Sequence, residues 1–479
     1  MGHKVGADVE ALRSAGRSMI ARAGGLEQCS RELDRIAQLE TVWAGQDTDS
    51  FQAAWFRGTR PQLTAVVAAV RSAGETMLRN ADAQEAVSND LGAELAPIPT
   101  PRPDPNADHS VPRYPNQGQA DLTDAQLRDL KDKLRDATDI TTGDDFVGNG
   151  GDIASLRDAL AKLSPAELNQ FLASLSDDEL RRLGQTVGGD NSGLFGGGTN
   201  AFDRQDLLDQ LLSKASPDQA RRVESLIPWY QPDAQAMGDQ AHGQTGDHSN
   251  AWMTPNGPVI SDHPQGPADI RQGGYGTCVV DSSAGALVNA DPNWAKDHVV
   301  ENANGTVSVK LYEDGHEHWV TVSKDLPDDG SGGQKGAKPG PGGNWNAYVE
   351  KALAQVYADD DSNDGPGDKT YGPGNYRAIE GNYGPDVLKY LTPQGTTQDH
   401  DPGTLWQAAH DGRPAIVSTF GTKPDGAPDG YVAGHEFFVV GTDGDKVILQ
   451  NPWGPTETKL VITQDQYSKY FQNATVVNR

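Results

Sequence analysis

The first ninety-two residues carry apolar side chains at helical intervals. Apolar positions seven residues apart are Leu12, Met19, Leu26 and Leu33, followed later by Leu63, Val70 and Met77. This spacing predicts two helices, each with one narrow apolar face. Gly45 can end the first helix and Trp43 can fill the turn, so we predict a helical hairpin over residues 1–92. An ordinary self-contained hairpin fits the pattern, but a lone hairpin buries little. We therefore expect a partner hairpin or a second copy.

The next segments alternate between polar connections and helical periodicity. Residues 93–120 are rich in proline and predict an extended linker. Residues 121–228 are helical again and contain no catalytic grouping of side chains, so we interpret them as a spacer or interaction domain. Four of their helix starts have capping-box signatures, at Thr123, Ser164, Ser176 and Ser216. Residues 229–262 are polar and predict a second linker.

The pattern changes over residues 263–479. The stretch "TCVVDSSAGALVNA" predicts a short helix of small residues beginning near Cys278. The stretches "EFFVVG" and "KVILQN" predict two strands joined by the turn "TDGD". The glycine-rich run 328–344 predicts a flexible joint between two lobes. We therefore expect a multidomain chain, with an all-α hairpin and helical spacer followed by a two-lobed α+β domain.

The charge of the chain narrows its possible partners. Forty basic and 68 acidic residues give a net charge of −28. A surface this acidic repels nucleic acids and anionic membranes and suits a secreted protein. Apolar runs fall short of the roughly 18 residues that a membrane helix needs, so we expect no membrane insertion. Charged residues interrupt the N-terminus, so a general secretory signal is not indicated, while export by another route stays open.

The chain has two cysteines, Cys29 and Cys278, which cannot form a disulfide framework. Cys278 is either a buried core thiol or a nucleophile. A nucleophile gains from a helix N-terminus, where the helix dipole stabilises the thiolate. Its flexible approach "RQGGYG" contains Gly273, Gly274 and Gly276, which we expect to let the backbone approach a substrate and its oxyanion closely.

A nucleophilic cysteine also needs a base, and the predicted hairpin supplies one. His435 begins the first strand and Asn451 ends the second. The two ends of an antiparallel hairpin lie side by side, so the imidazole should meet the side-chain amide. Such a partner orients the ring and fixes its tautomer. Each residue alone is weak evidence for an active site. Cys278, His435 and Asn451 in this chain order together predict a catalytic triad.

Residues 264–479 resemble the calpain-type cysteine peptidase core of the papain-like clan. The matching segments, in chain order, are "QGGYGTC", "VTVSKDLP", "WNAYVEKALAQVYA", "YRAIEGNYGPDVLKYLT", "GHEFFVV" with "LQNPWG", and "ITQDQYSKYF". Two features depart from the family. Val279 replaces the aromatic residue that usually follows the nucleophile, and only 16 positions separate the histidine from the asparagine. Both departures leave the substrate preference open.

The resemblance implies a role for each site residue. Cys278 would be the nucleophile, and His435 would act first as base and then as acid. Asn451 would orient His435. Gln272 and the Cys278 backbone N–H would form the oxyanion hole, and Trp453 would shield the His–Asn pair from water. Simple packing would also account for Gln272 and Trp453.

The N-terminal hairpin resembles the WXG100 and related families that type VII secretion systems export. The resemblance lies in Trp43-Ala44-Gly45 at the predicted turn, within about ninety helical residues. It implies an exported protein of actinobacterial type. These families often carry a tyrosine-based signal after the second helix, yet the first tyrosine here is Tyr114. The signal would then be missing or supplied by a partner.

Calcium is the one cofactor that the resemblance raises, because calpain cores often need it. The acidic run "ADDDSNDGPGDKTY" places Asp360, Ser362, Asp364 and Gly365 at calcium-loop offsets. Its twelfth position is Tyr371 rather than glutamate, so it fails as an EF-hand. We expect a solvated acidic loop, with no required cofactor and calcium possible.

Together these patterns predict a calcium-optional, calpain-like cysteine endopeptidase acting on proteins or peptides. The N-terminal hairpin predicts a type VII-secreted effector, and a cytoplasmic protein if that interpretation fails. Two alternatives remain, a non-catalytic binding module and an amide transferase on the same fold.

Overall fold

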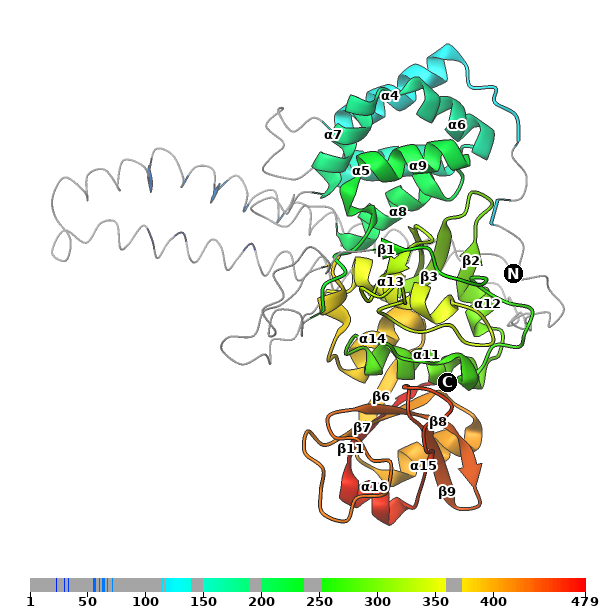
Figure 1. The fold of residues 1–479 in the computed structure, drawn as a ribbon. Helices are drawn as coiled ribbons and strands as arrows, with labels where there is room; N and C mark the ends of the chain where they lie inside the picture. The colour runs from blue at the N-terminus through cyan, green and yellow to red at the C-terminus, as the bar shows by residue number, and fades with distance from the viewer. Residues whose placement is uncertain are drawn as a thin grey trace, which may run out of the picture. The chain divides into compact units, whose positions relative to one another are not determined.

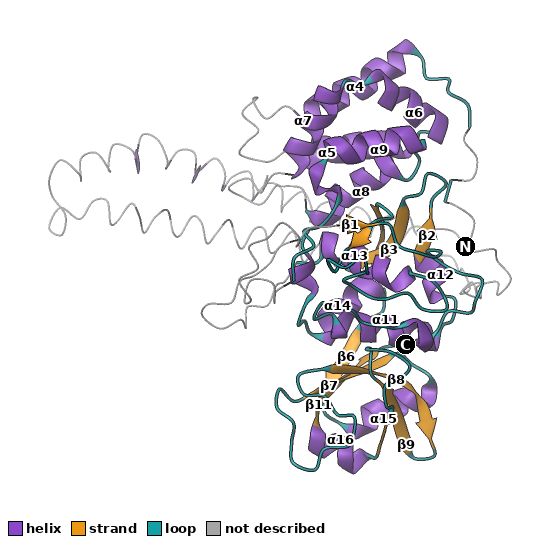
Figure 2. Cartoon of the chain, in the orientation of Figure 1, coloured by secondary structure: helices purple, strands orange, loops and turns teal. Residues whose placement is uncertain are grey.

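The computed structural model describes residues 113–114, 118–138, 150–188, 200–236, 252–358 and 373–479, together with isolated positions between 23 and 71. The chain divides into two compact units, Met1–Asp104 and Pro105–Arg479. Figures 1 and 2 label and colour the elements of the second unit, in which helices come first and strands follow. This unit combines helices with several antiparallel sheets, so the expected α+β composition is present.

Little of the first unit is described. Its isolated described positions are helical, among them Ala23, Leu63 and Val67. Trp43-Ala44-Gly45 and the two apolar faces as a whole lie outside the described residues. The hairpin over residues 1–92 therefore stays a prediction.

Among the described residues, six helices form the first part of the second unit. They are α4 (Asp124–Thr138), α5 (Gly150–Ala161), α6 (Pro165–Ser174), α7 (Asp177–Gly188), α8 (Ala201–Leu212) and α9 (Pro217–Leu226). Leucine side chains and Phe171 form their common core. The predicted capping box at Ser164 is confirmed, because its hydroxyl accepts the Glu167 N–H while the Glu167 carboxylate accepts the Ser164 N–H. Ser216 likewise caps α9.

The helical segment is bonded directly to the strands that follow it. Asp209 of α8 accepts a hydrogen bond of 2.6 Å from Thr321 and forms an ion pair with Arg113. His318 lies 3.0 Å from Asp206 on the same helix. The polar groups of α8 thus join this bundle to the α+β part of the same unit.

The connection over 229–262 is more structured than its composition predicts. After the short 3-10 helix η3 (Pro228–Tyr230), the Asp233 N–H donates to Gly374 O at 2.8 Å, and Asp233 pairs with Arg377. Near its other end, β1 (Trp252–Met253) pairs with β5 (Leu326–Pro327). The expectation of a plain linker is therefore wrong at both described ends, because backbone pairing to distant segments orders polar residues that sequence composition marks as loop.

The first lobe surrounds a buried helix. Its elements are η5 (Pro267–Asp269), α11 (Cys278–Ala290), α12 (Trp294–His298), β2 (Val299–Glu301), β3 (Val307–Glu313), β4 (His316–Val322), β5, α13 (Trp345–Val356), η6 (Tyr376–Ile379) and α14 (Gly384–Leu391). Strands β2, β3 and β4 form an antiparallel sheet in that order. Helices α11 and α13 contribute more side chains to the core than any other element, and β3, β4 and α14 add further apolar residues.

The second lobe is built on a six-stranded antiparallel sheet in the order β10-β9-β8-β7-β11-β6. Its elements are β6 (Thr396–Asp399), α15 (Pro402–Asp411), β7 (Ala415–Thr419), β8 (Glu436–Asp443), β9 (Lys446–Gln450), β10 (Leu460–Ile462), α16 (Gln464–Tyr470) and β11 (Phe471–Val477). The β8–β9 pair confirms the predicted hairpin, with Phe438 opposite Gln450 and Asp443 opposite Lys446.

The glycine-rich run 328–344 is not the joint between the lobes. It leads into α13, which belongs to the core of the first lobe. Its backbone lies against the approach to Cys278, since the Lys338 N–H donates to Arg271 O and the Gly274 N–H donates to Lys335 O, both at 2.7 Å. The many glycines of this run therefore allow a close backbone contact and do not mark a flexible boundary between the lobes.

Candidate active site

Cys278 is the first residue of α11, as the sequence predicts, and its thiol is free and partly exposed. Gly273, in the segment before Cys278, makes a close contact with a neighbouring loop, whereas we expected a close approach to substrate. A Cβ at Gly273 would lie 1.9 Å from the carbonyl oxygen of Gly336. Gly273 therefore permits the approach of the neighbouring loop. The expectation that it makes room for substrate is not supported by this contact.

His435 and Asn451 meet at the open end of the β8–β9 hairpin. Their side chains are joined by a hydrogen bond of 2.9 Å between His435 Nε2 and Asn451 Oδ1. Thr419 of β7 fixes the His435 backbone, because its hydroxyl accepts the His435 N–H at 2.8 Å and its N–H donates to His435 O. The antiparallel register thus places the imidazole next to the amide.

A second contact settles which way this hydrogen bond runs. Asn451 Oδ1 also lies 3.0 Å from the backbone N–H of Trp453, which can only donate. The atom accepting both bonds must therefore be the amide oxygen, and His435 Nε2 must carry a proton. In the neutral ring Nδ1 is then the unprotonated nitrogen. That nitrogen is the one available to take a proton from a nucleophile.

Trp453 covers the histidine on one side while remaining half exposed. Its ring centroid lies 4.9 Å from that of His435, with the planes tilted by 48°. About 47% of the Trp453 residue surface is exposed. His435 itself is 8% exposed. The indole therefore packs against the His435 ring at the protein surface.

Gln272 lies beside the same hairpin end. Its backbone N–H donates to Pro452 O at 2.8 Å, which ties the approach to Cys278 to the residue after Asn451. Its side-chain Nε2 donates to Tyr275 O at 2.9 Å. An amide nitrogen carries two protons, so one N–H of Gln272 remains for a further acceptor.

The thiol and the imidazole come from different lobes and are brought close through Glu436. The backbone N–H of Glu436, the residue after His435, acts on the Cys278 thiol and favours its ionised form. One turn further along α11, the Ser282 hydroxyl donates to Glu436 O at 3.1 Å. Within the described part of the chain, no hydrogen bond joins Cys278 directly to His435.

Both groups are neutral at rest. Burial, with a smaller contribution from the nearby Glu436 carboxyl, raises the pKa of the Cys278 thiol to about 12, while two backbone N–H groups oppose the shift. Burial also lowers the pKa of His435, against the opposing effect of the hydrogen bond that its Nε2 donates to Asn451 Oδ1. A thiol with this pKa is protonated at neutral pH, so chemistry through the thiolate would require the thiol to lose its proton first.

Glu436 is a site residue that the sequence analysis missed. It is 4% exposed, and burial raises the pKa of its carboxyl to about 8. Ser418 of β7 donates to its Oε2 at 2.8 Å, while its Oε1 is buried without a hydrogen-bond partner. The signal was present as a single acid in the apolar strand "EFFVVG", on the side occupied by Phe438.

A second missed feature is a carboxyl pair beneath the start of α11. The Thr277 hydroxyl lies 2.9 Å from Asp281 Oδ2 and 2.7 Å from Glu350 Oε1. Asn346 donates to the other Asp281 oxygen, and the Ala337 N–H donates to the other Glu350 oxygen. Burial raises the pKa of Glu350 to about 7, and it raises that of Asp281 as well, with the Glu350 charge adding to the shift.

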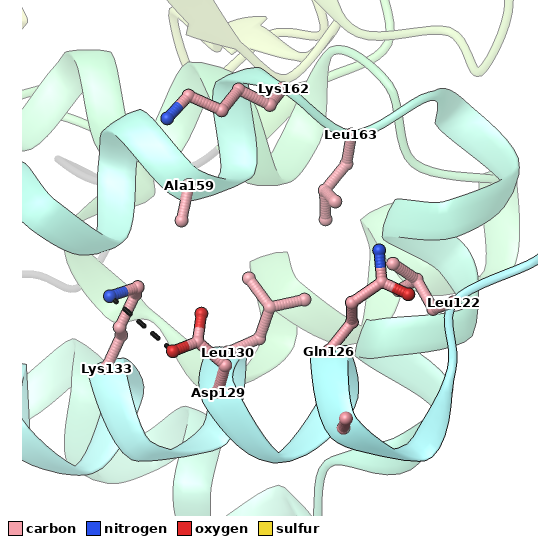
Figure 3. Close-up of a pocket in the computed structure, with 9 residues that line it drawn as sticks. Leu122, Gln126, Asp129, Leu130, Lys133, Ala159, Lys162 and Leu163 are labelled. Atoms are coloured by element: carbon pink, nitrogen blue, oxygen red, sulfur yellow. Dashed lines mark ion pairs between the residues drawn. The ribbon is translucent and has the colours of Figure 1, made fainter.

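Other parts of the molecule offer less chemistry. Among the described residues, no three His, Cys, Asp or Glu side chains gather as metal ligands would. The calcium-loop positions from Asp360 to Tyr371 lie outside those residues. Figure 3 shows a groove of about 450 Å³ between α4 and α5, lined mainly by aliphatic side chains with lysines at its rim. Its nine lining residues include no Cys, His or Ser, so it offers no nucleophile and imidazole together.

No protein-family model and no curated protein sequence matches this chain. Among the described residues, the structure contains no helix with both the length and the apolar character to cross a membrane.

Proposed function

We propose that residues 263–479 form a calpain-like thiol endopeptidase of the papain-like clan. The observation that carries the proposal is the 2.9 Å hydrogen bond from His435 Nε2 to Asn451 Oδ1. This bond leaves Nδ1 as the base. The residue after His435 on the same hairpin, Glu436, contacts the Cys278 thiol through its backbone N–H. A cysteine at a helix start, a histidine base and an amide that orients it are the three groups that acyl transfer needs.

The proposed reaction has two halves. As the Cys278 sulfur attacks the peptide carbonyl carbon, His435 Nδ1 accepts the thiol proton and the carbonyl oxygen becomes an oxyanion. Collapse of this intermediate breaks the C–N bond, and the imidazolium protonates the leaving amine. A water molecule then attacks the thioester with His435 as base, which releases a carboxylic acid and restores the thiol.

The oxyanion donors follow from the same geometry. The Cys278 N–H belongs to the first turn of α11, where backbone donors lack partners within the helix. The second N–H of Gln272 is the other donor, and the bond from its backbone to Pro452 O keeps it near the His–Asn hairpin. Such donors stabilise the developing charge more than they stabilise the ground state.

The high pKa of the Cys278 thiol affects the first chemical step, the attack of sulfur on the peptide carbonyl. A resting thiol of pKa about 12 makes proton transfer to His435 part of the attack step. Rates should therefore depend on the base, and bare thiol reactivity should be low. The remaining expectations, export through the N-terminal hairpin and calcium as an optional ligand, belong to this proposal and rest on the sequence resemblance.

A peptide library incubated with the full chain in H₂¹⁸O tests the proposal. We expect new carboxyl termini carrying one ¹⁸O, and none with Cys278→Ala. Incorporation of an added amine in place of water would instead indicate the amide transferase. A folded wild-type chain that leaves every peptide intact, with and without calcium, would overturn the enzymatic proposal and favour the binding module.

A further inference from the structure

Glu436 places a buried carboxyl next to the nucleophile without a counterion. Its Oε1 has no hydrogen-bond partner, its Oε2 has only the Ser418 hydroxyl, and its negative charge acts on the Cys278 thiol. Within the described residues it forms no ion pair. A buried carboxylate oxygen without a donor is costly, and a cation that reaches it satisfies both its charge and its hydrogen-bonding capacity.

We propose that Glu436 is a specificity-determining residue that receives a cationic side chain of the substrate beside the scissile bond. This inference rests on the proposed thiol peptidase function and names its substrate class, peptides with an arginine or lysine near the cleaved bond. Ser418, whose hydroxyl donates to Glu436 Oε2, is only half-buried, while Glu436 itself is 4% exposed. A guanidinium or ammonium could replace the serine hydroxyl as donor.

A second carboxyl lies against the approach to the nucleophile. Glu380 is half-buried, and its Oε2 accepts the Gly276 N–H at 3.1 Å, two residues before Cys278. Each lobe thus places one carboxyl near this segment, Glu380 at Gly276 and Glu436 at the Cys278 thiol. The chain as a whole carries a net charge of −28. Acidic groups around a site raise the local concentration of cationic ligands and repel anionic ones.

The titratable groups around Glu436 come from several elements. Cys278 and Asp281 belong to α11, His435 precedes β8, and Tyr467 of α16 has its pKa raised partly by the Glu436 charge. All of these are neutral or anionic at rest. No lysine or arginine of the described residues forms an ion pair with Glu436, so a cation for this carboxylate would have to come from outside.

Recognition would also activate the thiol. The Glu436 charge is one of the causes that raise the pKa of Cys278. A substrate cation paired with Glu436 neutralises that charge, so the thiolate becomes easier to form when the correct peptide is bound. Binding energy from a side chain that does not react is thereby used in the chemical step.

The test compares peptides that differ only in arginine or its neutral isostere citrulline at each position next to the cleaved bond. For the wild-type chain we expect kcat/KM to favour arginine by roughly 10- to 100-fold at one position. In Glu436→Gln this preference should fall to about twofold or less. The control Glu317→Gln, which changes an exposed carboxylate on β4, should retain it.

Two measurements keep the test decisive if Glu436→Gln folds poorly or nothing is cleaved. In the wild type, the arginine preference should grow between pH 6 and pH 9, because Glu436 ionises near pH 8 while arginine stays charged. Iodoacetamide labelling of the Cys278 peptide, followed by mass spectrometry, should be accelerated by arginine amide but not by citrulline amide, because a cation paired with Glu436 makes the reactive thiolate easier to form.

The outcomes separate the two proposals. Equal cleavage of arginine and citrulline peptides would overturn the role of Glu436 and leave the peptidase proposal standing. Cleavage of neither peptide would count against the peptidase, and selective acceleration of labelling by arginine amide would then still support a cation site at Glu436. Equal labelling rates with both amides would overturn that site as well.

Discussion

Glu350→Gln tests whether a carboxyl beneath the nucleophile holds a proton in the folded protein. The Thr277 hydroxyl contacts both Asp281 and Glu350 but has one proton to donate. One of the two acids must therefore be protonated. Burial raises the pKa of Glu350 to about 7, which makes Glu350 a holder of that proton below neutral pH. Glutamine keeps its shape and still accepts the Ala337 N–H.

The magnitude follows from proton linkage. The folded-state pKa of Glu350, about 7, lies above the ordinary value of 4.5 for an exposed glutamate. Its contribution to stability is fully present below pH 4.5 and is lost as the pH rises towards 7. The slope of about 1.4 kcal/mol per pH unit gives a loss of about 3 kcal/mol, of which roughly 2 kcal/mol falls between pH 5 and pH 8.

The assay is urea unfolding of the full chain, followed by tryptophan fluorescence from pH 5 to pH 8. Relative to wild type, Glu350→Gln should gain about 2 kcal/mol of stability over this range, because its amide does not titrate. Glu317→Gln, on the exposed part of β4, should follow the wild-type pH dependence. A Glu350→Gln curve parallel to the wild type would show that Glu350 does not exchange its proton in this range and would refute the reasoning.

Three further predictions concern the site itself. Asn451→Ala should lower kcat/KM by roughly 10- to 1,000-fold, because His435 and the Trp453 N–H lose a shared acceptor, while circular dichroism should show an intact fold. Wild-type activity in this variant would show that Asn451 does not orient the base. Gln272→Ala should lower kcat by about 100-fold with little change in KM, and a change in KM alone would exclude an oxyanion role. Chelation of calcium should change the rate by less than about twofold, and full loss with recovery on adding calcium would show that the ion is required.

The hairpin part of the site could be predicted because its determinants are local. The short apolar runs in "EFFVVG" and "KVILQN" and the short turn between them fix the register that brings His435 to Asn451. The small residues after Cys278 likewise mark a buried helix. Patterns of this kind depend on neighbours in sequence, so they hold without knowledge of the tertiary fold.

The missed features depend on contacts distant in sequence. Glu350 meets Thr277 from 73 positions away, and no local pattern marks an acid in an otherwise regular helix as buried. The run 328–344 has the composition of a flexible joint, yet its backbone bonds hold it against Arg271 and Gly274. The glycine content of this segment indicates conformational freedom. The tertiary fold shows that this freedom serves a close backbone contact with the approach to Cys278.

The rate of peptide-bond hydrolysis by the full chain, compared with Cys278→Ala and His435→Ala, tests the central claim most directly. Each variant would be checked for folding by circular dichroism, and the rate constant would be measured on one peptide chosen from the library. The account predicts measurable hydrolysis by the wild type and nearly complete loss of hydrolysis with His435→Ala. It predicts no hydrolysis by Cys278→Ala, because no other group can carry the acyl intermediate. Hydrolysis that persists undiminished in folded Cys278→Ala would contradict it.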